Sequence, residues 1–367
     1  MNELSIFDFL PEEEADRFRP KKATDWKWSF ADYPKEKNGL KVFSCFACGG
    51  GSTMGYKLAG CEVLGCCEID PKMNEIYIKN HNPKYNFLMD IREFNAIPNE
   101  DLPEELFHLD ILDGSPPCTT FSMAGDREET WGKKKKFREG QAEQTLDDLS
   151  FIFIETVAKL KPRCVIMENV EGLIKGEAWR YVQRIYKEFM AIGYQVKHWL
   201  CKGEHMGIPQ KRHRVFFVAL RNDVHFDISN LDMSFNYEPV TFGEIKSPQG
   251  TPIKGEKTKL LVENIVYGDL DLSFVSGRLF DKPNSRFNSM IIYDDKVNPT
   301  ITGKSTNIRY DTREYMSVED VITSQTFPQD YDFGNRTIGL VTYICGMSVP
   351  PVMIKRIVQR LLESGVL

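Results

Sequence analysis

The sequence predicts an α/β fold, with a doubly wound and mostly parallel sheet and a smaller lobe of irregular structure. Three observations predict it. Between residues 41 and 219, short apolar runs alternate with segments of helical periodicity, the pattern of a sheet covered on both faces. A glycine-rich loop directly follows the first apolar run. From residue 221 to 297 the periodicity dissolves into short pieces separated by glycine and proline, which predicts a separate lobe.

The elements of the main part can be placed in order. Strands are predicted where apolar residues run together without helical spacing, at 41–46, 62–67, 107–112, 163–167, 194–200 and 215–219. Helices are predicted at 54–58, 71–80, 149–160 and 177–191, and later at 317–325 and from Pro351 onward. Because strands and helices alternate, ligands are expected at the carboxyl ends of the strands.

These patterns divide the chain into four parts. They are an arm, a large domain, the irregular lobe and a segment returning to the large domain, at residues 1–38, 39–220, 221–297 and 298–367. A hydrophobic content of 41% over 367 residues suits one large core and a smaller lobe. No apolar run approaches the roughly 20 residues of a membrane span, so we expect a cytoplasmic protein without membrane contact.

The charge and cysteine content limit the classes of partner and metal site that this protein is expected to have. Nine cysteines show no paired CxxC spacing, so we expect free thiols and no metal site. A net charge of −6 argues weakly against a nucleic-acid partner. Residues 131–138, however, carry lysines and arginine and no acid, which indicates either a local cationic loop or an ordinary solvated surface.

The glycine loop fits neither of two familiar nucleotide-binding patterns. Met54 stands where GxGxxG needs its last glycine, and Tyr56 follows Gly55 where the Walker pattern needs lysine. Glu68 ends the second strand, where such folds bind ribose hydroxyls, and Asp90 follows the next apolar stretch. Each acid alone is more often a helix cap, and Asp70 before Pro71 has that spacing.

Cys118 is the candidate nucleophile because it follows Pro116 and Pro117 at the end of an apolar run. The prolines stiffen the turn and present the thiol, although most free cysteines are buried and structural. Glu168 ends another strand and could serve as a proton donor or as a helix cap. Residues 123–144 are too long for an ordinary connection and are expected to form a lid or to be disordered.

In this order, these motifs resemble the C5-cytosine DNA methyltransferases that use S-adenosylmethionine and have a Rossmann-like fold. The matching segments are 46–51, 68, 90, 117–122, 168–170, 210–214, 313–328 and 346–351. The resemblance covers residues 41–220 and 297–361, and the lobe falls where the family has its target-recognition domain. It implies methyl transfer to C5 of a cytosine flipped out of duplex DNA, through a covalent Cys118 adduct at C6.

The resemblance also implies residue roles. Cys118 would attack, Glu168 would protonate the N3 edge, Arg214 would bind O2, and Arg212 would support the site electrostatically. The implied cofactor contacts are Phe46, Ala47, Cys48, Gly50, Gly51, Glu68, Ile69, Asp90, Pro117, Leu149, Met347 and Ser348. The expected DNA contacts are Lys133, Lys134, Lys135, Lys136 and Gln210.

The chain departs from the family pattern at three cofactor positions. Cys48 replaces the first glycine of the loop, Ile69 stands where an aromatic residue is frequent, and Met347 replaces an asparagine. Two alternatives follow: an RNA (tRNA) C5-cytosine methyltransferase, and a nucleic-acid-binding relative without catalysis. A dinucleotide-dependent oxidoreductase is disfavoured by the failed GxGxxG pattern.

Further partners are expected by resemblance alone. A monomer acting on double-stranded DNA, with a cognate restriction endonuclease, is typical of the family. Residues 3–7 resemble a bacterial sliding-clamp peptide, which predicts a clamp contact through Leu4 to Phe7. The alternative, an apolar patch that covers the core, is favoured.

Overall fold

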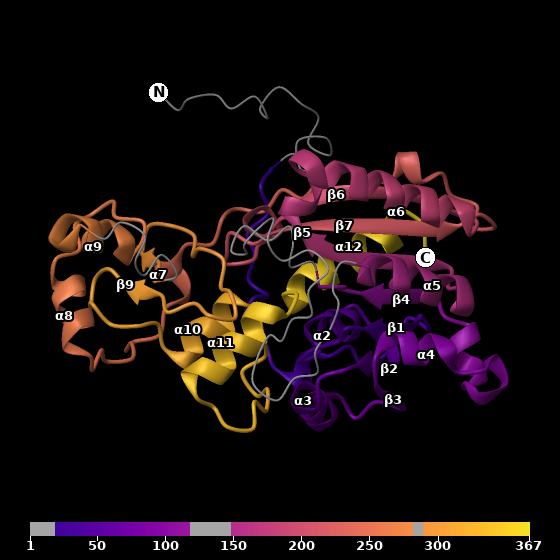
Figure 1. Cartoon of the computed structure of the whole chain (residues 1–367), viewed down its shortest axis with the longest axis horizontal. Helices are drawn as coiled ribbons and strands as arrows, with labels where there is room; N and C mark the ends of the chain where they lie inside the picture. Colours follow the sequence, from indigo (N-terminus) through magenta and orange to yellow (C-terminus); the bar gives the residue numbers. More distant parts are fainter. Residues whose placement is uncertain (1–18, 118–147, 282–288) are drawn as a thin grey trace.

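A seven-stranded sheet forms the centre of the protein (Figure 1). The computed structural model describes residues 19–117, 148–281 and 289–367. The strands are β1 (Lys41–Cys45), β2 (Glu62–Glu68), β3 (Tyr85–Leu88), β4 (Ile111–Gly114), β5 (Cys164–Val170), β6 (Tyr194–Lys202) and β7 (His213–Arg221). Their order is β3-β2-β1-β4-β5-β7-β6, and only β7 runs antiparallel to its neighbours. The predicted doubly wound, mostly parallel sheet is confirmed.

The strand order places a crevice between β1 and β4. From β1 the chain moves outward through β2 to β3, then returns to the other side of β1 and continues through β4 to β5. Ligands of open α/β sheets bind where the winding direction reverses, outside the carboxyl ends of the strands. The functional site is therefore expected beside the ends of β1 and β4.

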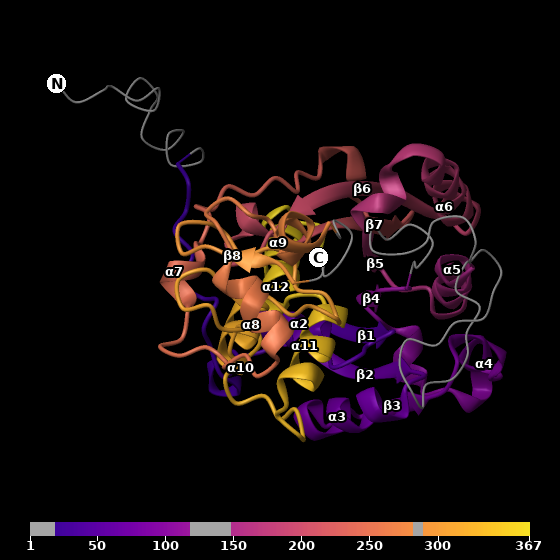
Figure 2. The ribbon, with the colours of Figure 1, turned by 60° about the vertical axis from the view of Figure 1, so that its left-hand side comes forward.

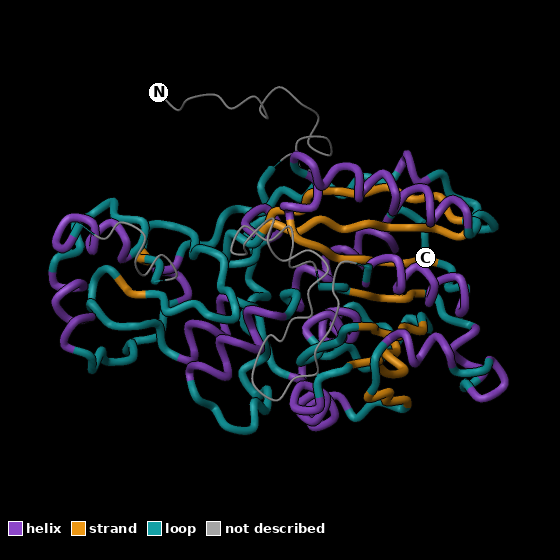
Figure 3. Tube along the Cα trace, viewed as in Figure 1, coloured by secondary structure: helices purple, strands orange, loops and turns teal. Residues whose placement is uncertain are grey.

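Helices cover both faces of the sheet (Figures 1 and 3). They are α2 (Gly51–Leu58), α3 (Pro71–His81), α4 (Ile91–Ala96), α5 (Leu149–Leu160), α6 (Trp179–Ala191) and α12 (Pro351–Glu363). Helix α11 (Ile338–Met347) instead packs against α10 (Val318–Ser324), beside the sheet. Successive strand residues such as Val42 and Phe43 belong to two different hydrophobic clusters, one on each face. Strands buried on both faces read as continuous apolar runs, which is why the sequence identified them.

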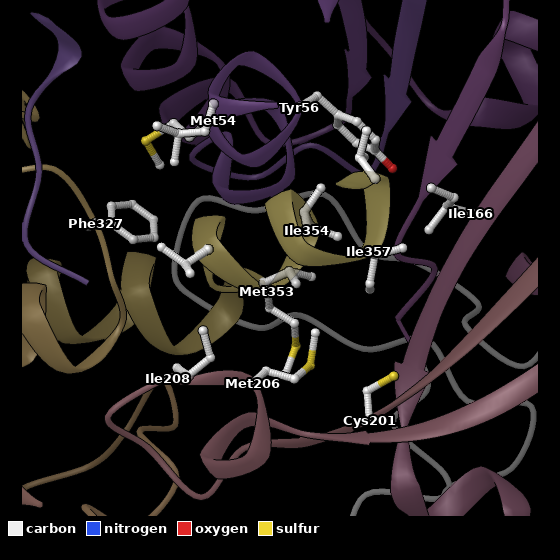
Figure 4. Packing of buried hydrophobic residues seen from close by; sticks show 14 of the residues in the cluster. Met54, Tyr56, Ile166, Cys201, Met206, Ile208, Phe327, Met353, Ile354 and Ile357 are labelled. Atoms are coloured by element: carbon white, nitrogen blue, oxygen red, sulfur yellow. The ribbon is translucent and has the colours of Figure 1, made fainter. Parts of the chain in front are cut away.

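The C-terminal helix α12 lies in the core of the large domain, against α2. Its predicted apolar face is confirmed, because Met353, Ile354, Ile357, Val358 and Leu361 are all fully buried. Figure 4 shows how this helix packs among side chains of α2, β5 and the segment before β7: Met353, Ile354, Ile357, Met54, Tyr56, Ile166 and Ile208. The returning segment thus completes one face of the sheet.

Residues 338–363 include the one stretch, among the described residues, that is long and apolar enough to cross a membrane by composition. Of its most apolar window, 67% is buried inside the protein. A helix packed in a core needs apolar side chains, so burial inside the protein accounts for the apolar composition of this stretch.

The lobe, whose helices and strands are seen in Figure 2, has its own small core. Its elements are α8 (Glu256–Glu263), α9 (Leu272–Phe280), β8 (Ile291–Ile292) and β9 (Ile308–Arg309). The cluster includes Ile308, from beyond residue 297, whereas Phe242 of α7 (Phe242–Ile245) packs with the large core. Ile308 belongs to the lobe's cluster because β9 pairs with β8, and Ile308 is in register with Ile291.

A buried ion pair joins β9 of the lobe to α10 (Val318–Ser324). Arg309 Nε lies 2.9 Å from Asp320 Oδ2, and neither side chain is more than 1% exposed. Asp320 also accepts a hydrogen bond from the backbone of Ser317, which caps α10. The predicted helix at 317–325 is confirmed, and it is the element on which the lobe is anchored.

Residues 19–38 pack against the large domain. Trp28 is buried and donates its Nε1 hydrogen to the carbonyl of Thr326 at 2.8 Å. Asp25 pairs with Lys355 and Arg356 of α12, at 2.7 and 2.6 Å. This part of the predicted arm is thus a cap on α12.

One predicted strand has different bounds in the structure, and two helices of the structure had no prediction. The strand expected at 107–112 begins at Ile111, because only Ile111 to Gly114 face β1, and Phe107 belongs to a 3₁₀ turn after Pro103. The helices α4 and α11 were not predicted. α11 contains Gly346, whose hydrogen faces the Thr302 carbonyl carbon, where a Cβ would stand only 2.2 Å away.

Candidate active site

The carboxyl ends of four neighbouring strands form one rim. The loop 46–50 follows β1, Glu68 ends β2, residues 115–117 follow β4, and Glu168 lies near the end of β5. Parallel strands bring these ends to the same edge of the sheet. The structure therefore assembles the groups that the sequence placed at separate strand ends.

The loop after β1 is shaped by its backbone. Phe46 and Cys48 have positive φ angles of 58° and 48°, and Gly50 has 82°. The Cys48 amide donates to Glu68 Oε2 at 2.8 Å, which ties the loop to β2. Burial, followed by the charge of Glu68, raises the pKa of the Cys48 thiol to about 12. The thiol that replaces the family's glycine therefore stays protonated at neutral pH.

The glycines of this loop are needed for protein packing. A Cβ on Gly50 would lie 2.0 Å from His81 Nε2, and one on Gly51 would lie 2.3 Å from the Val349 carbonyl. The Gly49 carbonyl accepts from the Tyr331 hydroxyl at 2.5 Å and lies 3.3 Å from His81 Nε2. Burial lowers the pKa of His81 to about 3, so this ring is neutral.

Glu68 is a buried carboxylate with backbone partners. Its two oxygens accept from the amides of Cys48 and Asp70, each at 2.8 Å, and burial raises its pKa. Each oxygen keeps capacity for another donor, as ribose hydroxyls would require. Asp70 instead caps α3, accepting from the Lys72 and Met73 amides, as its position before Pro71 predicted.

A small pocket lies beside Glu68. It is lined by Phe46, Cys67, Ile69, Met89, Asp90, Ile91 and Leu149. Four of these, Phe46, Ile69, Asp90 and Leu149, are among the implied cofactor contacts. Apolar walls with a single carboxylate suit a flat heterocycle such as adenine. Asp90 also caps α4 through the Arg92 amide, which confirms the helix-cap interpretation, while its contact with the cofactor stays a prediction.

The other implied cofactor residues surround the same loop. Ala47 is buried, and Pro117 is the last described residue before the gap. Ser348 is buried, and its hydroxyl has no hydrogen-bond partner among the described residues. Met347 is 40% exposed. An orphaned buried hydroxyl next to the loop fits a site that a polar ligand completes.

Glu168 and Arg214 form the charged pair of the rim. Arg214 Nε lies 2.7 Å from Glu168 Oε1, and the side chains are 15% and 12% exposed. The antiparallel register of β5 and β7 brings them together, because Val170 faces Arg214 and Glu168 faces Phe216. Sequence spacing alone could not show this pairing, since β7 was not known to run antiparallel.

Asn169 links this pair to the proline turn. Its Nδ2 donates to the Pro116 carbonyl at 3.3 Å, and the side chain is buried. The turn that leads to Cys118 is therefore held against the end of β5. Cys118 itself, Lys133 to Lys136 and the clamp-like residues 3–7 lie outside the described residues.

One site assignment needs correction. Gln210, expected to contact DNA, is fully buried, and its amide bonds with Ile301, Ser324 and Gln325. Its polar atoms are thus used inside the protein. Arg212 is also buried and donates to the carbonyls of residues 301, 346 and 348. Burial holds the pKa of Arg212 well below its usual range, and the side chain braces the returning segment.

Sequence reasoning assigned no role to Asp113, which lies in β4 close to the rim. It accepts from Ser44 Oγ at 2.6 Å and from the Tyr56 hydroxyl at 3.0 Å. Burial raises the pKa of Asp113 to about 7. A carboxylate inside an apolar run, directly before Gly114, was the signal that could have identified it.

Comparison with known proteins gives relatives that are named type II methyltransferases. The chain is 32% identical over 196 residues to the type II methyltransferase M.FnuDI of Fusobacterium nucleatum, covering 53% of this chain and 51% of the relative. It is 23% identical over 339 residues to M1.HphI of Haemophilus parahaemolyticus, covering 89% and 87%. The chain spans 51%, 58% and 41% of M.FnuDI, M.NgoPII and M.Sau96I.

Solved structures share the fold, and a family model shares the sequence pattern. A prophage-encoded E. coli protein matches 89% of this chain and 99% of its own, with 18% identity and a TM-score of 0.65. The S. pombe Dnmt2 methyltransferase matches 89% and 99%, with 16% identity and a TM-score of 0.58. The model of the C-5 cytosine-specific DNA methylases matches residues 40–363, so the chain belongs to this family.

Proposed function

We propose that this protein transfers a methyl group from S-adenosylmethionine to C5 of a flipped-out cytosine in duplex DNA, through a covalent Cys118 adduct at C6. The observation that carries the proposal is the Glu168–Arg214 pair, set at the strand-end rim beside the turn that Asn169 holds. The small, mostly apolar pocket that includes Asp90 lies at the same rim. The proline turn that precedes Cys118, a charged pair and a small apolar pocket therefore share one edge of the sheet, which supports the proposal.

The residue types suit this chemistry. C5 of cytosine is a poor nucleophile, and addition of the Cys118 thiolate at C6 raises its electron density. Glu168 would hold a proton at N3, while Arg214 would bind the O2 that gains charge. The cofactor, when bound through Glu68 and the Phe46 pocket, supplies the methyl group. Loss of the C5 proton then releases Cys118.

The target base must leave the duplex, because its C5 and C6 atoms are stacked there. We assign the closing role to the segment 123–144 and the DNA contacts to Lys133, Lys134, Lys135 and Lys136. An RNA substrate is the second candidate, since the same chemistry acts on any unstacked cytosine. The lobe between residues 221 and 297 favours DNA, as its position matches that of a target-recognition domain.

Transfer of labelled methyl groups tests the proposal directly. The protein is incubated with labelled cofactor and either duplex DNA or tRNA, and we expect label in DNA. Cys118→Ala should abolish transfer, whereas Cys61→Ala should retain it, because Cys61 is buried at the opposite end of β2. A duplex containing 5-fluorocytosine should trap the native protein covalently. Label in tRNA only would establish the alternative, and activity that survives Cys118→Ala would overturn the mechanism.

Glu168→Gln separates proton transfer from binding. The amide keeps the size of the side chain and loses its acidity, so we expect a large fall in single-turnover rate with little change in DNA affinity. Equal losses of rate and affinity would assign Glu168 a positioning role instead.

A further inference from the structure

A cavity of about 220 Å³ lies where the lobe joins the large domain. One wall comes from Thr251 of the lobe and from Tyr315, whose backbones bond to each other at 2.9 Å. Another comes from α10 and the first turns of α11, two helices that Figure 1 shows between the lobe and the sheet. The segment 301–307, which leads into β9, lines the rest. A compound in this cavity would contact the lobe and the returning segment at once.

The cavity is separate from the site at the strand-end rim. Of the described residues that line it, none belongs to the implied catalytic or cofactor contacts, and none lines the pocket beside Glu68. Helix α11 connects the two places. Its first turns line the cavity, and its Ile344 lies against the glycine loop, where a Cβ on Gly49 would stand 2.7 Å from it.

The walls of the cavity are mostly apolar. Ile301, Met316 and Val321 line it and are at most 3% exposed. Ile338 and Gly339, at the start of α11, are exposed and mark its opening, where a Cβ on Gly339 would meet nothing within 4 Å. Within the described ranges no charged side chain lines the cavity, and burial of an unpaired ion is costly. The cavity therefore suits an uncharged compound and not a phosphate.

Asn307 is a buried polar group of this cavity that lacks a partner. Its side chain is 4% exposed, and neither Oδ1 nor Nδ2 bonds to any residue that the structure describes. Two hydroxyls that line the cavity are already used, since Ser305 accepts from the Thr302 amide and Thr306 lies 2.6 Å from Ser289 Oγ. Buried polar groups are normally hydrogen-bonded, because an unpaired amide costs free energy. The unpaired amide therefore indicates a ligand that supplies both a donor and an acceptor.

The backbone fixes the position of Asn307 before any ligand arrives. Its carbonyl accepts from the Met316 amide at 2.9 Å, and the next amide, of Ile308, donates to the Met290 carbonyl at 2.8 Å. A group that is already in place loses little freedom when it binds. A dry apolar cavity of about 150 Å³ is enough to hold benzene. The cavity beside Asn307 is larger, so it has room for one ring with a polar substituent.

We propose that this cavity is a second ligand site, which binds a small, uncharged ring compound through Asn307. The ring lies against Ile301, Met316 and Val321, and an amide-type edge of the ligand pairs with the Asn307 carboxamide by two hydrogen bonds. The proposal stands apart from methyl transfer, because the cavity and the unpaired amide carry it. Benzamide, a six-membered ring with one primary amide, has the required chemistry and serves as the probe.

Methyl NMR of the full-length protein, labelled with carbon-13 at its isoleucine and methionine methyl groups, measures binding at the cavity itself. Benzamide should shift the Ile301 and Met316 signals to saturation. It should leave Met190 unchanged, since Met190 is 59% exposed on α6. Isopropenylbenzene, which has nearly the same shape and no polar atom, is the second probe. A cavity that holds only water would show no shift with either probe at millimolar concentration, which would overturn the proposal.

Asn307→Leu tests the role of the amide. Leucine has a similar volume and cannot bond, so the ratio of the dissociation constants of benzamide and isopropenylbenzene should rise roughly 10- to 100-fold, the scale of two hydrogen bonds. The Tm should also rise, because the unpaired amide is removed. Asn222→Leu is the matched control, since Asn222 is exposed at the end of β7, and it should leave the ratio unchanged. A ratio in Asn307→Leu equal to the native one would overturn the proposal.

A change in α11 tests whether the probes occupy this cavity. Thr342 lines it and is 5% exposed, so Thr342→Met should fill the space and abolish the Ile301 shifts, whereas Thr342→Ser should keep them. Shifts that persist in Thr342→Met would place the probes elsewhere and contradict the assignment. If Thr342→Met fails to fold, the ratio in Asn307→Leu decides. These measurements need neither cofactor nor DNA, so their outcome is independent of methyl transfer.

Discussion

At the residue scale, Asp113 is the most consequential group outside the motifs. Its carboxyl is buried next to the β1–β4 crevice, where the Ser44 and Tyr56 hydroxyls donate to it. These hydrogen bonds favour the ionised form, but burial outweighs them and raises the pKa to about 7. Burial of a charge without a cation is the costly element of this arrangement.

Asp113→Asn should change how stability depends on pH. Because the folded pKa, about 7, lies above the ordinary aspartate value of 3.8, the folded state binds more protons between these values. Stability is therefore lost as pH rises through this window. Relative to the variant, the native protein should lose roughly 1 to 4 kcal/mol across it.

Denaturant unfolding of both proteins at several pH values provides the measurement for Asp113. Asparagine keeps an acceptor oxygen for one of the two hydroxyls, and its NH₂ group can donate to the oxygen of the other, so the variant should fold. If the free energy of unfolding changes with pH in the same way for both proteins between pH 4 and 7, Asp113 is already ionised in the folded protein.

Motif order predicted the residues of the rim, but it did not predict their orientation. Glu68, Asp90, Glu168 and Arg214 lie at strand ends, as expected from alternating strands and helices. Gln210 and Arg212 lie in the same motif as Arg214, yet both point into the core. Their partners are residues 301–348, more than 80 positions away, and no local pattern carries that information.

At the element scale, the loop between β1 and α2 is confined by α3. Gly50→Ala would place a Cβ 2.0 Å from His81, at a φ of 82°, whereas Gly193 has a φ of 86° with nothing within 4 Å. Each alanine pays about 1 kcal/mol or more for the left-handed backbone. Only Gly50→Ala also displaces His81, so we expect a larger loss of stability and weaker cofactor binding.

Thermal unfolding and calorimetric titration of the cofactor compare the two glycine variants. Gly193→Ala should keep the native cofactor affinity, because Gly193 lies between α6 and β6. Equal losses of stability in both variants would show that the contact with His81 costs nothing.

The Arg309–Asp320 pair predicts a contrast between buried and exposed charges. Asp320→Ala leaves Arg309 unpaired at the joint with the lobe, and such a loss typically costs about 3 to 5 kcal/mol. Glu256→Ala removes the exposed partner of Lys259, a contact of 2.7 Å, and should cost at most about 1 kcal/mol. Chemical denaturation measures both; a small loss in Asp320→Ala would mean that water reaches Arg309.

Helices whose apolar residues repeat with a clear helical period were predicted from the sequence. Elements whose bounds depend on contacts with distant parts of the chain were not. α12 has one apolar stripe, which indicates a helix packed on a core. α11 is apolar on most positions and contains two glycines, so its sequence has no preferred face. The shifted start of β4 has the same kind of cause, since its bounds are set by pairing with β1.

At the scale of the whole molecule, a net charge of −6 means that the proposed DNA substrate needs a local patch of positive charge. Replacement of Lys133, Lys134, Lys135 and Lys136 by alanine should reduce the slope of log affinity against log salt by roughly two to four, at about 0.9 for each phosphate contact. Sequence preference should hardly change, because phosphate contacts position the protein and base contacts specify the site.

Fluorescence titrations of duplex DNA at several salt concentrations measure this slope. Lys35→Ala with Lys37→Ala serves as the control, since both lysines are exposed at the end of the arm. An unchanged slope in the quadruple variant, with normal turnover, would leave these lysines as a solvated surface.

The packing of α12 on α2 has a consequence for synthesis of the chain. α2 ends at Leu58, and its partner begins at Pro351, roughly 300 residues later. At about 5 to 20 residues per second, a ribosome needs roughly 15 to 60 seconds to cover that distance. During this interval one face of the sheet stays uncovered and Arg212 lacks the carbonyls of residues 346 and 348. The nascent protein therefore completes this face of the sheet only after α12 has been synthesised, and until then its exposed apolar surface is a target for chaperones.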